Sequence, residues 1–129
     1  MATRKKTGSK QPDTSRHRIF AMPFAKLYPA WLNKVERKSR SRKELDQVIG
    51  WLTGYTAAGL KKLTEGEDDV GSFLDRAPAF NPAAELITGT VCGVRVEEVV
   101  EPSMRKLRQL DKLIDELARG RPLEKILRA

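Results

Sequence analysis

Residues 81–101 have the sequence NPAAELITGTVCGVRVEEVVE, a long and weakly charged run that holds the single cysteine of the chain, Cys92. The opening Asn-Pro pair is a strong start for a helix, because the asparagine side chain accepts from a free backbone N–H and proline suits the first helical position. If this helix continued along the run, Gly89 and Gly93 would lie on one face, next to two rows of apolar side chains. We therefore predict a helical core segment that the rest of the chain covers.

The alternative for this run is a short strand over Thr90–Val96, which its β-branched residues and alternating side chains favour. The other candidate strand lies at His17–Ala21, and a lone two-stranded ribbon has marginal stability without further packing. The sequence therefore favours a helix and leaves one short hairpin as the alternative. In either form the neighbours of Cys92 are apolar, so we expect a buried and unreactive cysteine.

The segments on either side carry the apolar spacing of amphipathic helices. Ser41 and Glu44 form the pattern of a capping box ahead of the clearest helix, and Gly54 suits the left-handed residue that ends it. Pro102 opens the longest helix, which Gly120 closes. The sequence thus predicts helices with defined ends before and after the central run.

Two further boundaries follow from local residue chemistry. Pro29 is expected to break the apolar pattern of Ile19–Tyr28 and to open a second helix that ends at about Lys38. Thr56 is expected to start a short helix, because its hydroxyl can accept from a free backbone N–H.

The sequence contains no recognisable catalytic, cofactor-binding or metal-binding motif. Its only histidine, His17, is far from Cys92, so a histidine–cysteine pair would require the N-terminal segment to fold over. The acidic loop at 65–69 lacks the alternating ligands of a calcium site, and an aspartate there is better placed to cap the next helix. Glu97 and Glu101 are better explained by the dipole of the helix that follows them. We assign no catalytic residue, no metal and no cofactor.

Length and composition indicate one domain. The chain has 129 residues, of which 40% are hydrophobic, enough for a single core. No apolar run approaches the roughly 20 residues of a bilayer span, and the polar N-terminus lacks the apolar region of a signal peptide. A single cysteine agrees with a reducing compartment. We expect a cytoplasmic protein that does not associate with membranes.

The net charge of +8 is concentrated in one third of the chain. Residues 1–43 contain thirteen Lys or Arg and two acidic residues, a net charge of +11, whereas residues 44–129 carry a net charge of −3. Such asymmetry predicts an acidic partner, either nucleic acid or an acidic protein. The candidate nucleic-acid-binding residues are Arg4, Lys5, Lys6, Arg37, Lys38, Arg40, Arg42 and Lys43.

The first seventeen residues have too few apolar side chains to offset the entropy of ordering. We therefore predict a disordered basic tail over 1–17 and a helical domain over 18–129. Within that domain Trp31, Trp51 and Tyr55 are candidate interaction residues, because aromatic side chains anchor interfaces when they stay exposed. The alternative is that they belong to the core, since they flank apolar stripes.

Several runs resemble a small bacterial family catalogued only as a domain of unknown function, family twenty-two-hundred of that series. The matching runs are MPF at 22–24, YP at 28–29, WLTGY at 51–55, LITG at 86–89, VCGVRVEE at 91–98 and LDKLIDEL at 110–117. The resemblance implies an all-α fold, a single compact orthogonal bundle of about six short helices. It implies no activity, and α+β with one short hairpin is the alternative fold.

The sequence therefore predicts a non-catalytic binding or interaction module, associated with nucleic acid through its basic N-terminal third. One alternative is a homodimeric protein-interaction module. A carboxylate- or magnesium-dependent enzyme is a lesser alternative, because it would require an inward-facing pair of carboxylates and the sequence shows none.

Overall fold

The computed structural model describes residues 18–128. In chain order the elements, with η for a 3-10 helix, are η1 (Arg18–Ala21), α1 (Phe24–Glu36), α2 (Arg42–Thr53), α3 (Ala57–Glu65), α4 (Val70–Asp75), η2 (Pro82–Leu86), β1 (Thr90–Val91), β2 (Val94–Arg95), η3 (Val96–Glu98), α5 (Pro102–Ala118) and α6 (Leu123–Ile126). This architecture confirms the predicted all-α fold. The predicted tail over 1–17, with its candidate residues Arg4, Lys5 and Lys6, lies outside the described residues.

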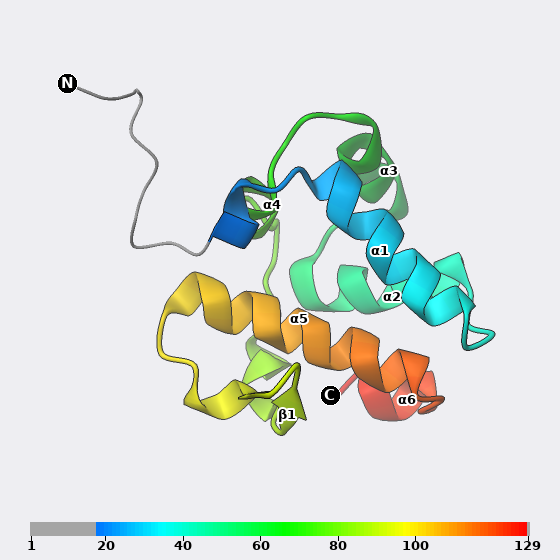
Figure 1. Ribbon diagram of the computed structural model, residues 1–129, viewed down its shortest axis with the longest axis vertical. Helices are drawn as coiled ribbons and strands as arrows, with labels where there is room; N and C mark the ends of the chain where they lie inside the picture. Colours follow the sequence, from blue (N-terminus) through cyan, green and yellow to red (C-terminus); the bar gives the residue numbers. More distant parts are fainter. Residues whose placement is uncertain (1–17, 129) are drawn as a thin grey trace.

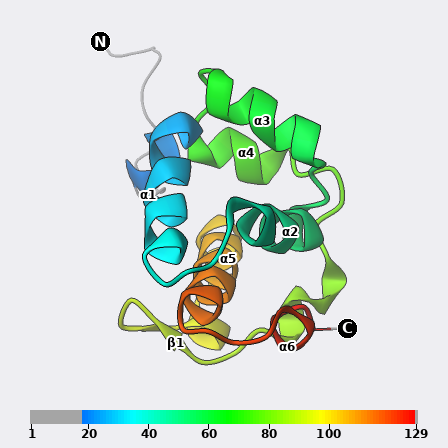
Figure 2. The ribbon, with the colours of Figure 1, turned by 90° about the vertical axis from the view of Figure 1, so that its right-hand side faces the viewer.

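Helix α5 lies at the centre of the molecule. It contacts α1, α2 and α4 on one side and β1, η3 and α6 on the other (Figures 1 and 2). Glu101 begins the helix by accepting hydrogen bonds from the backbone N–H groups of Ser103 and Met104, which confirms the helix start predicted at Pro102. Its apolar stripe is fully enclosed, and the buried residues include Leu107, Leu110, Leu113, Ile114 and Leu117.

Residues 81–101 do not form the predicted helical hub. The 3-10 helix η2 ends at Leu86, and β1 then pairs antiparallel with β2, Thr90 opposite Arg95 and Val91 opposite Val94, before the short 3-10 helix η3. Cys92 and Gly93 form the turn with φ of +51° and +76°, the left-handed pair that a tight two-residue hairpin requires and that a helix excludes. The strand alternative was therefore correct in kind but not in its bounds or partner. Two short strands pair with each other inside the run, and Arg18–Ala21, within the other candidate strand, forms η1.

The structure also corrects the expected environment of Cys92. Its side chain is exposed, because it occupies the tip of the hairpin rather than the face of a helix. The hairpin is short, and α5 contacts it through a hydrogen bond from the Lys112 ammonium to the carbonyl of Thr90 at 3.2 Å. Arg105 of α5 holds the flanking segments by donating to the carbonyl of Val99 and pairing with Glu85. A two-stranded ribbon persists here because it is packed on a helix.

Pro29 does not break α1, which runs unbroken from Phe24 to Glu36. The buried residues Phe24, Tyr28 and Val35 form one stripe across the proline, while Pro29 itself is exposed. Burial on both sides of the proline outweighs its cost of about 3 kcal/mol in a helix interior. Tertiary packing therefore makes one helix of the two segments that the sequence predicted on either side of Pro29.

The other predicted helix boundaries are confirmed. Ser41 and Glu44 form a capping box at α2, and Gly54 ends that helix with φ of +86°. Thr56 caps α3 and Asp69 caps α4, each side chain accepting from a backbone N–H three residues later. Within residues 18–128, no helix has both the length and the apolar character that a membrane crossing requires.

The end of α2 predicts a measurable difference between two glycines. A Cβ on Gly54 would lie 2.7 Å from the backbone nitrogen of Ala79, whereas a Cβ on Gly120, with φ of +90°, would meet nothing within 4 Å. Gly120→Ala should therefore cost only the left-handed strain, about 1 kcal/mol. Gly54→Ala should cost about 2 kcal/mol more, because the clash adds overpacking. Urea unfolding of both variants measures this, and equal losses would contradict the proposed close packing.

The capping box predicts an acid-sensitive contribution to stability. The Arg40 guanidinium, together with the backbone N–H of Ser41, holds the pKa of Glu44 below its ordinary value of 4.5. Its stabilising effect is therefore present above pH 4.5 and lost as the pH falls through the lowered pKa. Glu44→Gln should lower the free energy of unfolding by roughly 1 kcal/mol at pH 7 and by less in acid. Urea unfolding at both pH values tests this, and a pH-independent difference would contradict it.

Candidate functional site

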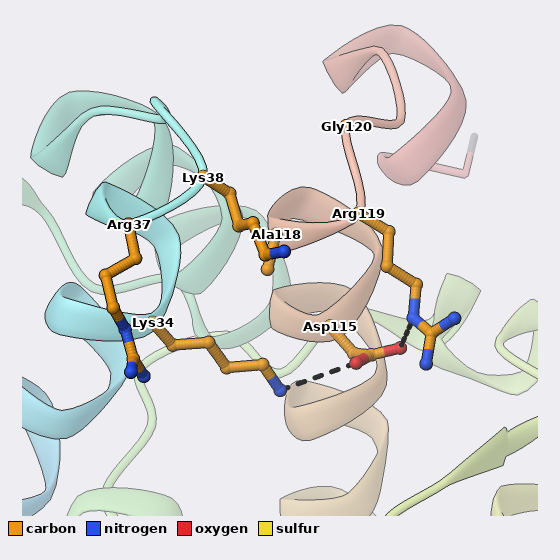
Figure 3. Close-up of a pocket in the computed structure, with 7 residues that line it drawn as sticks. All are labelled: Lys34, Arg37, Lys38, Asp115, Ala118, Arg119 and Gly120. Carbon is orange, nitrogen blue, oxygen red and sulfur yellow. Dashed lines mark hydrogen bonds and ion pairs between the residues drawn. The ribbon is translucent and has the colours of Figure 1, made fainter.

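An open hollow lies between the C-terminal ends of α1 and α5 (Figure 3). It has a volume of about 1160 Å³, and four cationic side chains line it with a single carboxylate. We call it the basic hollow; its lining residues are Lys34, Arg37, Lys38, Asp115, Ala118, Arg119 and Gly120. The fold therefore brings Arg37 and Lys38, two of the residues predicted to contact nucleic acid, beside Arg119, which lies far from them in the sequence.

The charges of the basic hollow are only partly neutralised. Asp115 accepts from Arg119 at 2.8 Å (Nε to Oδ2) and pairs with Lys34 at 3.4 Å (Nζ to Oδ1), as Figure 3 shows. Arg37 and Lys38 are exposed, and among the described residues neither has an ion-pair partner. One carboxylate thus faces an excess of cations, and the hollow can attract an anion.

Helix chemistry explains why cations gather at this place. Arg37 caps the C-terminus of α1 and Arg119 caps that of α5, where the carbonyl ends of the helices favour positive charge. This effect contributes to stability without any ligand. The side chains of Arg37 and Lys38 extend into solvent, so their N–H groups remain available to donate to a ligand.

Arg40 has a different role from its basic neighbours. Its guanidinium donates to the carbonyl oxygens of Leu117 at 3.2 Å and Arg121 at 2.9 Å, and it pairs with Glu44 at 3.0 Å. Only 14% of its side chain is exposed. Arg40 therefore ties the turn between α1 and α2 to the end of α5, and it holds the two walls of the basic hollow together.

A second concavity runs along the outer face of α2 and has a volume of about 660 Å³. We call it the α2 groove; its lining residues are Arg42, Lys43, Asp46, Gln47, Gly50, Trp51, Tyr55, Ala57 and Leu127. Arg42 and Lys43 were predicted to bind nucleic acid, and Trp51 and Tyr55 to form an interface. The fold brings these two predicted sets into one site.

The third aromatic candidate, Trp31, does not share this site. It is 6% exposed, and its ring packs edge-on against Phe24 at a centroid distance of 6.1 Å. The core alternative therefore holds for Trp31. Trp51 and Tyr55 are half-buried, so each packs on the core and still faces the groove.

A partly buried hydrogen bond lies beside the α2 groove, at its end near α1. The hydroxyl of Tyr28 donates to Oδ1 of Asp46 at 2.5 Å, and the Arg42 guanidinium lies 5.5 Å from the centre of the Tyr28 ring. Burial, followed by the bond to Asp46, raises the pKa of Tyr28 well above its usual range. Tyr28 therefore stays protonated, fixes the Asp46 carboxylate and supplies no base for catalysis.

The carboxylates that the sequence suggested for catalysis have structural partners. Glu97 accepts from the backbone N–H of Gly89 at 2.9 Å, and this bond holds the pKa of Glu97 below its ordinary value. Glu101 caps α5, as its position before Pro102 indicated. Within the described part of the chain, no three His, Cys, Asp or Glu side chains are grouped as metal ligands.

Several lining residues were not predicted as functional. Lys34 could have been found from the sequence, since it precedes Arg37 and Lys38 by three and four residues and so shares a helix face with them. Arg119, Gly50 and Leu127 gave no such signal, because only the fold brings them to these sites.

The sequence matches, over residues 18–128, the model of a family described as "Uncharacterized protein conserved in bacteria (DUF2200)". The crystal structure of the uncharacterized protein SP1917 is similar over 89% of this chain and 94% of its own, with 37% sequence identity and a TM-score of 0.83. No curated protein matches the chain.

The different burial of the two tryptophans can be measured in solution. In a Trp31→Phe variant the remaining Trp51 should be quenched by acrylamide and more strongly by iodide, because Arg42 and Lys43 attract the anion. In the matched Trp51→Phe variant, Trp31 should be shielded from both quenchers. Equal quenching of the two variants would contradict the placement of Trp51 in the groove.

Proposed function

The chain belongs to the bacterial family DUF2200, as its sequence motifs indicated, and we propose that it is a non-catalytic module that binds the phosphate backbone of a nucleic acid across the basic hollow. The observation that carries this proposal is the pair Arg37 and Lys38. They are exposed at a hollow that also contains Lys34 and Arg119, and no carboxylate of the described residues pairs with them.

The arrangement suits phosphate groups. Arginine can contact two phosphate oxygens at once through its planar fork of donors, and lysine acts as a mobile point charge. Asp115 pairs with both Lys34 and Arg119 in the lining of the hollow, so these two charges are oriented before a ligand arrives. An anion that enters meets positioned cations on two sides, from α1 and from α5 (Figure 3).

A nucleic acid fits this surface better than an acidic protein does. The cations are spread from α1 through the following turn to the start of α2, which matches a long and uniformly charged backbone. Phosphate contacts of this type position a protein on nucleic acid without reading its sequence. We therefore propose binding that does not depend on base sequence.

The surface gives no support for catalysis. The phenol of Tyr28 is held protonated, and Asp115 pairs with two cations. A reaction would require a free base or nucleophile near a bound group, and the lining of the hollow supplies neither.

The salt dependence of binding tests the proposal. We expect duplex DNA to bind at low salt, with an affinity that falls linearly in a plot of log K against log salt. The double variant Arg37→Gln/Lys38→Gln should flatten the slope by about 1.8, since each phosphate contact contributes about 0.9. Titrations followed by fluorescence anisotropy measure both values.

The matched control is Lys26→Gln/Lys62→Gln, which removes the same charge from exposed positions on α1 and α3 that do not line the hollow. Its slope should stay close to that of the wild-type protein. An equal change in both double variants would mean that net charge rather than the hollow binds DNA. Failure of both duplex and single-stranded DNA to bind at low salt would overturn the proposal.

A further inference from the structure

We propose that the α2 groove holds an unstacked base, so that the nucleic acid bound across the basic hollow is single-stranded. This inference rests on the proposed function and assigns the chemical class of its ligand. Binding of phosphate groups does not explain three of the residues that line the groove. These are the aromatic pair Trp51 and Tyr55, and Gly50, which precedes them.

The groove has the size and the lining of a site for a flat ring. Its volume of about 660 Å³ falls within the range of roughly 300–1,000 Å³ that is usual for small-molecule sites. Trp51, Tyr55 and Leu127 supply apolar surface, and bases stack on aromatic side chains of this kind.

Contacts within the protein position the aromatic wall, and Trp51 and Tyr55 both pack against the core. Tyr55 stacks on Phe73 at a centroid distance of 5.2 Å and donates to the carbonyl of Phe73 at 2.7 Å. The carbonyl of Trp51 accepts from the side chain of Asn81 at 3.1 Å. A Cβ on Gly50 would lie 2.9 Å from the carbonyl oxygen of Tyr55, so glycine allows the turn to pack closely. A base would therefore meet a preformed surface.

The charges of the groove favour a base with a phosphate at one end. Lys43 is exposed and has no ion-pair partner among residues 18–128, and Arg42 is held over the ring of Tyr28. Asp46 lines the groove one helical turn after Arg42, where its carboxylate would repel a second phosphate. The cationic end thus suits the backbone, and the aromatic end suits the uncharged ring.

The basic hollow and the α2 groove lie within reach of one strand. Lys38 in the hollow and Arg42 in the groove are four residues apart, so their Cα atoms are at most about 14 Å apart. Arg40, between them, anchors this turn to α5. A duplex would have to unstack a base to use both sites, at a cost of a few kcal/mol, whereas a single strand already offers free bases.

The test compares three ligands of about 15 units at the same salt concentration: an oligo-dT strand, an abasic strand of the same length and a duplex. We expect oligo-dT to bind roughly ten-fold more tightly than the abasic strand, because each stacked base strengthens binding by about that factor or more. Oligo-U in place of oligo-dT distinguishes RNA from DNA as the source of the base, and tight binding of either strand supports the inference.

Variants at Trp51 separate stacking from charge. Trp51→Leu should remove the preference for oligo-dT over the abasic strand, and Trp51→Phe should retain most of it. In a Trp31→Phe background, oligo-dT should quench the emission of Trp51 while the abasic strand should not. The abasic comparison uses the wild-type protein, so it remains decisive if Trp51→Leu fails to fold.

The outcomes distinguish this inference from the proposed function. Equal affinity for oligo-dT and the abasic strand, with the salt dependence retained, would overturn the base site and leave the phosphate-binding hollow in place. Failure of all three ligands to bind at low salt would overturn both. Sedimentation that showed a dimer with Trp51 shielded from quenchers would assign the groove to a second copy of the chain and would also overturn the base site.

Discussion

The burial of the apolar residues of α5 between elements on two opposite sides is the constraint on which the structure depends. Leu110, Leu113 and Leu117 are completely enclosed, so apolar partners must lie on opposite sides of one helix. Helices α1 and α2 form one side, and the segment at 81–101 with α6 forms the other (Figures 1 and 2). The central run of the sequence is therefore a cover for α5 rather than the element that the others cover.

The same packing positions the candidate site. Because α1 and α5 pack together, their C-terminal ends and the cations that cap them face one hollow. Arg40 reinforces this arrangement by binding the carbonyl oxygens of Leu117 and Arg121. A basic side chain with a structural role thus lies between Lys38 and Arg42, which extend to two separate concavities.

Local chemistry made some features predictable and not others. The caps at Ser41, Gly54 and Asp69 depend on a few neighbouring atoms, so their residue types identified them. Pro29 was misjudged because buried contacts on both sides of it outweigh a local preference. The burial of Cys92 was predicted wrongly because a short apolar run fits both a helix and a strand. The left-handed backbone at Cys92 and Gly93 distinguishes the two, because it forms the turn of a hairpin.

The sequence by itself determined the helical class, the ends of most helices and the concentration of positive charge before residue 44, because these follow from composition and from neighbours along the chain. Tertiary structure alone decided that Trp31 is buried while Trp51 faces a groove, and that Arg119 joins Arg37. Those outcomes depend on how helices distant in sequence pack against each other, and a helical pattern defines an apolar face without defining its partner.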